Sequence, residues 1–238
     1  MARVVIIGDV GGHPDQVRSA LSHIGARGDR LELPGDVIVV QVGDLVDRGP
    51  DHGDVLRLVR GYLERQPHQW VQLVGNHEGQ YLPGGTLFWP DPLARTDAQL
   101  LTSWWERGLM NVAAAVRTAD GDDLLVTHAG PLWTEAGWEL LEPWLAYHAA
   151  GGFVPFGQIH GHCAIVRYAD RTWQCPGRVR QRATVDWTAR HIRVRVGGRV
   201  FTGVDPKHGR AGAASWQPLV LADASLVSPL DATTNVSG

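Results

Sequence analysis

The sequence contains few cysteines and no long apolar run. Two cysteines, Cys163 and Cys175, are too few for a disulfide framework and fit a reduced, cytoplasmic setting. No run of about 18 apolar residues occurs, so we expect no membrane span. The first residues lead directly into a strand, without the apolar core of a signal peptide. These absences predict a cytoplasmic protein with no membrane partner.

Positive charge is not in excess either. The chain has 22 Lys and Arg against 25 Asp and Glu, which gives a formal net charge of -3. Nucleic-acid-binding proteins usually carry a basic surface, so this balance predicts no nucleic-acid partner. The hydrophobic content of 44% is sufficient for a sizeable core. We expect a single domain over residues 1–222 and a disordered polar C-terminal tail at residues 223–238.

Strand and helix patterns alternate over the first third of the chain. β-branched runs predict strands at 4–7, 37–42 and 70–74, and apolar residues at helical spacing predict helices at 14–25 and 51–65. Strands that alternate with helices form mostly parallel sheets with right-handed crossovers. The alternation therefore predicts an α/β fold.

Residues 79–148 depart from this alternation. Gly and Pro clusters predict a loop, followed by a helix at 96–107, a hairpin at 113–117 and 124–127, and a helical segment at 133–148. Six of the ten Trp residues fall in this stretch. We expect it to form a Trp-rich helical insert over the functional site. Beyond residue 164, the patterns are those of β-strands.

Polar side chains follow five of the predicted strands, each beside a glycine. In chain order they are Asp9, Asp44, Asn76 with His77, His128, and His160 with His162. Ligands of α/β proteins bind at the carboxyl ends of the strands, and carboxylate, amide and imidazole groups suit Mg, Mn, Fe or Zn. Each residue alone is more often a turn, cap or core residue. Five in succession predict a metal site, with Asp44 placed to bridge two ions.

The motifs at these strand ends resemble those of the calcineurin-like metallophosphoesterase superfamily. They are Gly8-Asp9, Gly43-Asp44-Leu45-Val46-Asp47-Arg48-Gly49, Gly75-Asn76-His77-Glu78, His128-Ala129-Gly130 and Gly161-His162. The second and third are most similar to the phosphoprotein phosphatase branch, which includes serine/threonine phosphatases and symmetrical dinucleoside tetraphosphatases. The resemblance spans residues 3 to about 205. It implies a central β-sandwich of mixed sheets flanked by helices, in four layers.

The resemblance also implies a metal-dependent phosphoester hydrolase with two divalent or trivalent metal ions (Mn, Fe, Zn or Mg). Asp9 would bind the first ion and Asp44 would bridge both. Asn76, His128 and one histidine of the last motif would hold the second ion. A hydroxide bridging the metals would attack phosphorus in line. The substrate would be a phosphoprotein or a small phosphorylated or nucleotide molecule.

Three further residues take roles from the same resemblance. His77 would donate a proton to the leaving oxygen and would be oriented by Asp47. Arg48, with Asn76 and His77, would bind the phosphate oxygens. A planar guanidinium suits this role because its fork matches two phosphate oxygens.

The first motif departs from the family pattern, because Gly11 stands where a metal-binding histidine is expected. His13 is a possible replacement. The last motif has two interpretations: His162 binds the second metal and His160 is an extra, or His160 binds the second metal and His162 the first. Alternate residues of a strand point the same way, so both imidazoles could reach one site. The second interpretation is favoured because it refills the coordination lost at Gly11.

Two alternative functions follow from these departures. A phosphodiesterase is favoured if both His160 and His162 bind metal. A degenerate, non-catalytic module that binds a phosphorylated ligand is favoured by Gly11. Retention of Asp44, Asp47 and Arg48 together with His77 favours catalysis over binding alone.

Overall fold

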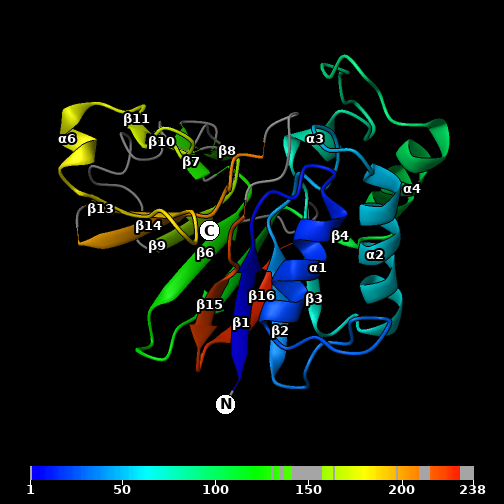
Figure 1. Cartoon of the computed structure of the whole chain (residues 1–238), viewed down its shortest axis with the longest axis horizontal. Helices are drawn as coiled ribbons and strands as arrows, with labels where there is room; N and C mark the ends of the chain where they lie inside the picture. The colour runs from blue at the N-terminus through cyan, green and yellow to red at the C-terminus, as the bar shows by residue number, and fades with distance from the viewer. Residues whose placement is uncertain are drawn as a thin grey trace.

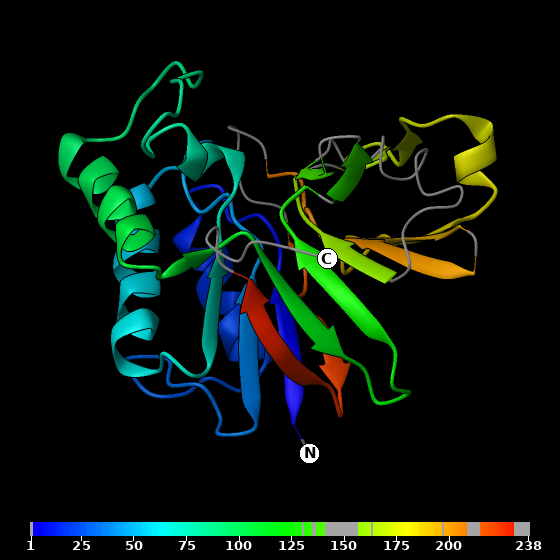
Figure 2. The same cartoon turned by 180° about the vertical axis from the view of Figure 1, so that it is seen from behind.

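Two β-sheets face each other, and helices cover the outer face of the first sheet (Figures 1 and 2). The computed structural model describes residues 2–129, 131–134, 137–140, 157–162, 164–196, 198–208 and 215–230. Within these residues, no helix is long and apolar enough to cross a membrane.

The first sheet has the strand order β15-β1-β2-β3-β4. Its strands are β1 (Arg3–Ile7), β2 (Val37–Gln41), β3 (Trp70–Leu73), β4 (Met110–Asn111) and β15 (Leu219–Ala222). All neighbours are parallel except β15, which is antiparallel to β1. The polar loops after β1, β2 and β3 therefore leave the same edge of the sheet.

Helices α1 (Pro14–His23) and α2 (His52–Arg65) connect these strands. Pro14 opens α1, where its fixed φ is compatible with the first helical turn. The Asp51 carboxylate caps α2 by accepting a 2.8 Å hydrogen bond from the Asp54 N–H. The described part of the chain also contains α3 (Asn76–Gly79), α4 (Arg95–Glu106) and α6 (Gly177–Arg180).

The second sheet has the order β12-β13-β14-β9-β6-β5-β16. Its strands are β5 (Ala113–Arg117), β6 (Asp123–Thr127), β9 (Gly157–His160), β12 (Ala183–Asp186), β13 (His191–Val196), β14 (Arg199–Gly203) and β16 (Ser225–Leu230). Neighbours β6, β9 and β14 are parallel. The residues that follow these three strands therefore lie at one edge of the second sheet.

Side chains of β1 alternate between two cores. Val5 and Ile7 pack with the helices, whereas Val4 and Ile6 pack between the sheets with residues such as Ile159. A third core lies on the outer side of β13 and β14 and includes Ile165, Val179 and Phe201. Two short pairs, β10 (Val166–Arg167) with β11 (Thr172–Trp173) and β7 (Pro131–Thr134) with β8 (Gly137–Leu140), complete the described strands.

The predicted α/β sandwich of mixed sheets with flanking helices is confirmed. The helix expected at 96–107 and the hairpin expected at 113–117 and 124–127 are confirmed as α4, β5 and β6, and β5 and β6 belong to the second sheet. A Trp-rich helical insert at 79–148 over the site stays a prediction. The helix predicted at 133–148 is wrong for residues 133–134 and 137–140, which are strands, and residues 141–156 lie outside the described chain. Aromatic residues favour strands, and Trp133 and Trp138 are backbone partners in this pair.

The predicted tail is also wrong in part. Residues 225–230 form β16, which pairs with β5 at the edge of the second sheet, with a register shift between Leu226 and Ser228. Pro229 is compatible with an edge strand, which leaves one side unpaired. Residues 231–238 lie outside the described chain.

Candidate metal centre

The loops after β1, β2 and β3 are joined by backbone contacts. The N–H groups of Val10 and Gly11 donate to the Asp44 carbonyl at 3.0 and 2.7 Å. Gly43 has φ +100°, and a Cβ there would lie 2.5 Å from the Gly75 nitrogen. A larger residue at position 43 is therefore excluded by both conformation and space. These contacts bring the predicted site residues of separate strands together.

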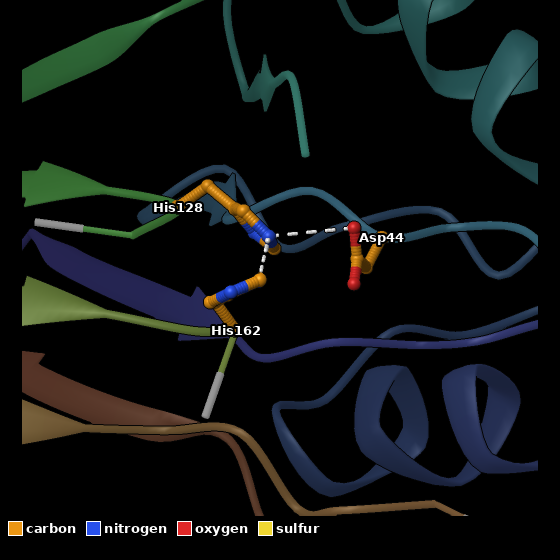
Figure 3. A group of neighbouring side chains, drawn as sticks. All are labelled: Asp44, His128 and His162. Atoms are coloured by element: carbon orange, nitrogen blue, oxygen red, sulfur yellow. Dashed lines mark hydrogen bonds and ion pairs between the residues drawn. The ribbon is translucent and has the colours of Figure 1, made fainter. Parts of the chain in front are cut away.

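Asp44, His128 and His162 form a group whose candidate ligand atoms all lie within 4.8 Å of one another (Figure 3). The His128 Nε2 atom is 3.4 Å from Asp44 Oδ1, 3.1 Å from His162 Nδ1 and 3.0 Å from Asn76 Oδ1. Figure 3 shows the three side chains converging from different segments of the chain. Four of the residues predicted to bind metal thus meet at one point.

The tautomer of His128 leaves its second nitrogen available to a metal. Its Nδ1 lies 2.9 Å from the Val42 carbonyl, which can only accept, so Nδ1 carries the proton. Burial lowers the pKa of His128, which favours the neutral ring with a lone pair on Nε2. This lone pair faces oxygens of Asp44 and Asn76. The donor set and its orientation fit a cation.

Four residues of the site have a left-handed backbone conformation. Asp44, Asp47, Arg48 and His162 have φ values of 55°, 64°, 61° and 66°. Non-glycine residues adopt this left-handed region rarely, and such residues cluster where function needs a fixed side-chain direction. Asp44 is further held by its carboxylate, because Oδ1 accepts the His77 N–H at 3.1 Å, whereas Oδ2 is buried without a hydrogen-bond partner.

Glu78 holds the backbone beneath Asp44, a role that the sequence did not indicate beyond its place in a motif. It is fully buried. Its Oε2 accepts from the N–H groups of Asp44 and Gly75 at 2.8 and 2.9 Å, and Oε1 accepts from Leu45 at 2.7 Å. Burial and the neighbouring Asp44 raise the pKa of Glu78 to about 7, against the effect of these three donors. Glu78 thereby joins the loops after β2 and β3.

His77 lies between Asp47 and Arg48. Its Nδ1 is 2.6 Å from Asp47 Oδ2, and its Nε2 is 3.2 Å from Arg48 Nη2. Gln80, which the sequence did not single out, donates to the same Asp47 oxygen at 2.8 Å. The Gln80 side-chain oxygen Oε1 accepts from the Trp89 N–H at 3.1 Å. The loop after α3 is therefore linked to the Asp47–His77 pair.

The remaining predicted residues lie around this group. Asp9 is buried and accepts the His162 N–H at 3.0 and 3.1 Å, and its pKa is raised well above the usual value by burial, then by Asp205 and Asp44. His13 lies at the start of α1, with its ring 4.9 Å from the ring of His208.

His160 is outside the three-residue group. It is the last residue of β9, where burial lowers its pKa to about 4, and its Nδ1 is 3.0 Å from the Gly161 carbonyl. His162 lies beyond the strand with positive φ. Because the strand ends before His162, strand alternation does not relate the directions of the two rings. Cys163 lies outside the described residues.

A cavity of about 600 Å³ opens beside the group. Its walls include Asn76, His128 and His162 on one side and Leu82, Pro83, Gly84, Gly85 and Trp105 on the other. The rings of Phe88 and Trp89 meet the His77 ring edge-on at 5.2 and 5.0 Å. The segment before and including α4 therefore borders the site, whereas Trp104 is a buried core residue.

Comparisons with known proteins agree with this geometry. A family model described as calcineurin-like phosphoesterase matches residues 2–187. No curated protein matches the sequence. The structure of a cold-active protein-tyrosine phosphatase from a psychrophilic Shewanella species is 13% identical and covers 96% of this chain and 81% of that chain, with a TM-score of 0.56. A second structure of a cold-active protein tyrosine phosphatase is 16% identical, covers 93% and 74%, and has a TM-score of 0.54. These two structures share the fold.

Proposed function

Because the chain belongs to the calcineurin-like phosphoesterase family and is a phosphoester hydrolase, we propose that it hydrolyses phosphomonoesters at a centre of two metal ions. The observation that supports this most is the environment of the Asp44 carboxylate. Its Oδ1 faces His128 at 3.4 Å, whereas Oδ2 lies 3.6 Å from Arg48 and 3.8 Å from His77. A metal ligand, a phosphate-binding cation and a proton carrier thus surround one buried carboxylate.

In this proposal Asp44, Asn76, His128 and His162 hold the second ion, and Asp9 and Asp44 hold the first. His160 is an internal support of the strand, not a ligand. Mixed oxygen and nitrogen donors suit Mn, Fe or Zn, and carboxylates also suit Mg. When bound, the ions would supply a nucleophile near neutral pH and neutralise charge on the phosphate.

Arg48 binds the phosphate in this proposal. Its side chain is 22% exposed, which leaves the guanidinium accessible from the site. A planar guanidinium forms two parallel hydrogen bonds with phosphate oxygens and stabilises charge that develops on them during transfer. Asn76, beside His128, is placed to assist through its amide.

His77 carries the proton to the leaving oxygen. Its Nδ1–H is held by Asp47, so Nε2 is the nitrogen directed towards Arg48 and Asp44. When a phosphate engages Arg48, Nε2 is released from that hydrogen bond and can carry a proton. The buried Asp47 carboxylate stabilises the imidazolium.

The side chains that border the site favour a substrate whose leaving group has a planar apolar part. Phe88, which is 52% exposed, and Trp89 stand beside His77, the side from which the leaving group departs. Aromatic rings bind planar groups by stacking or edge contacts. Both a phosphorylated aromatic side chain and a nucleotide present such a group.

Hydrolysis of an aryl phosphomonoester, with and without added Mn²⁺, tests the proposed function. Asp44→Asn should abolish turnover, whereas Asp122→Asn, in an exposed turn, should retain it. Faster hydrolysis of an aryl phosphodiester would support a phosphodiesterase instead. Binding of orthovanadate without any turnover would support the non-catalytic module.

A further inference from the structure

The segment after β14 reaches the first metal site from the second sheet. The Val204 N–H donates to the His160 carbonyl at 2.8 Å, which continues the pairing of β14 with β9. A Cβ on Gly8 would lie 1.9 Å from the Val204 carbonyl oxygen. Val204, which precedes Asp205, therefore contacts Gly8, which precedes Asp9. Each aspartate comes directly after a residue at which the two sheets touch.

The Asp205 side chain is buried, and its hydrogen-bonding capacity is only partly used. It is 1% exposed. Its Oδ1 accepts the Lys207 N–H at 2.7 Å, which closes a local turn, but its Oδ2 is buried without a hydrogen-bond partner. A buried carboxylate oxygen with no partner is costly unless a cation compensates it.

The balance of charges around Asp205 favours binding of such a cation. Asp9, Asp44 and Asp205 are each about 1% exposed, and Asp205 lies near enough to Asp9 to contribute to its raised pKa. In the part of the chain that the structure describes, Arg48 and Arg190 are the guanidinium groups whose charge acts on Asp205, and Arg190 donates to the Pro206 carbonyl at 2.7 Å. Two guanidinium groups do not neutralise three buried carboxylates.

Gly11 contributes no ligand from the loop after β1. It has φ +52°, and its N–H donates to the Asp44 carbonyl. A Cβ there would lie 3.6 Å from the Arg48 side chain. The residues assigned above to the first metal site are Asp9 and the shared Asp44, fewer donors than a stable site requires.

We propose that Asp205 completes the first metal site by offering its Oδ2 beside Asp9 and Asp44. The inference rests on the dinuclear centre proposed above. The three carboxylates are more widely spaced than the Asp44–His128–His162 group, the one cluster of ligand atoms within 4.8 Å that the described residues contain. A divalent cation would draw the carboxylates together, because it would offset their mutual repulsion.

Asp205→Asn tests the proposal, with Asp170→Asn as its matched control. Asn retains the oxygen that accepts the Lys207 N–H, so the turn is preserved. Asp170 forms the same turn, accepting from the Thr172 N–H at 3.2 Å, but on the surface. Manganese per chain is measured after saturation and gel filtration, with EPR to distinguish spin-coupled from isolated Mn²⁺ and circular dichroism to verify folding.

The wild-type and Asp170→Asn proteins should retain two ions and a spin-coupled signal. Asp205→Asn should retain one ion with an isolated signal. Two coupled ions in folded Asp205→Asn would overturn the role of Asp205 and leave the dinuclear centre intact. One ion in the wild-type protein would overturn the dinuclear centre itself, and this inference with it.

A second variant covers the case in which Asp205→Asn does not fold. Asp205→Glu keeps the carboxylate and displaces it by one methylene. One of the two Mn²⁺ dissociation constants should then shift at least fivefold while the other is unchanged. Two unchanged constants would overturn the proposal.

Discussion

Asp47 and His77 share a hydrogen bond of 2.6 Å between Oδ2 and Nδ1, and both side chains are almost fully buried. Gln80 donates to the same oxygen at 2.8 Å, so the carboxylate is held from two sides. The bond fixes the direction of the imidazole and leaves Nε2 at the site. The catalytic role proposed for His77 depends on this orientation.

Substituting His77 with Asn should reduce turnover in a way that depends on the leaving group. We expect kcat to fall about 10²–10⁴-fold for a poor leaving group, which needs a proton, and much less for 2,4-dinitrophenyl phosphate. Metal content should not change. An equal loss for both leaving groups, or loss of metal, would contradict the assignment of His77 as proton donor.

Glu78→Gln should weaken metal binding without direct contact with the ions. Gln replaces one oxygen by an NH₂ group, which leaves either the Leu45 N–H or the Asp44 and Gly75 N–H groups without an acceptor. Each unsatisfied buried donor costs about 1–3 kcal/mol, so the loop that carries Asp44 should shift. Mn²⁺ affinity, measured by titration calorimetry, should fall at least tenfold. Glu106→Gln, on the exposed end of α4, is the control and should match the wild type.

Gly161→Ala should displace Asp9. A Cβ at position 161 would lie 2.1 Å from Asp9 Oδ1 and 2.6 Å from the Val42 side chain. Gly177→Ala is the control, because a Cβ there meets nothing within 4 Å. Thermal unfolding and Mn²⁺ titration of both variants should show loss of stability and affinity for Gly161→Ala alone. Wild-type affinity in Gly161→Ala would show that the position of Asp9 is not critical.

Stability of the metal-free protein should decline in acid because of His160. Burial lowers the pKa of His160 to about 4 in the folded protein, against about 6.5 in an unfolded chain. The folded state therefore binds fewer protons, and stability present above pH 6.5 is lost as pH falls towards 4, by at most about 3 kcal/mol. Urea unfolding from pH 7 to 4.5 should show a shallower decline for His160→Gln than for the wild type. His68→Gln, an exposed control, should follow the wild type.

Much of the fold was predictable because its patterns are local. The runs before Asp9, Asp44 and Asn76 are short, apolar and β-branched, and each ends at glycine, so the parallel strands followed directly. The segment at 133–140 was not predictable in this way, because Trp residues suit either a helix or a strand and pairing decides between them. Strand β16 was not predicted, because the polar residues Ser225 and Ser228 interrupt its apolar pattern. The segment gains stability as a strand only by pairing with β5.

The site was predictable as a set of residues but not as a geometry. The motifs identified Asp44, His128 and His162, which the structure brings together. They could not distinguish His160 from His162, since the end of β9 at His160 and the positive φ of His162 appear only in the folded chain. No role was predicted for Asp205, because its closeness to Asp9 appears only where two distant segments touch at Gly8 and Val204.

Elemental analysis of the Mn²⁺-loaded wild-type protein, alongside hydrolysis of an aryl phosphomonoester by the same sample, is the decisive experiment for the dinuclear centre. We expect close to two manganese ions per chain and turnover that disappears on chelation and returns with Mn²⁺. An absence of bound metal, with no turnover in Mn²⁺, Fe²⁺, Zn²⁺ or Mg²⁺, would contradict this expectation.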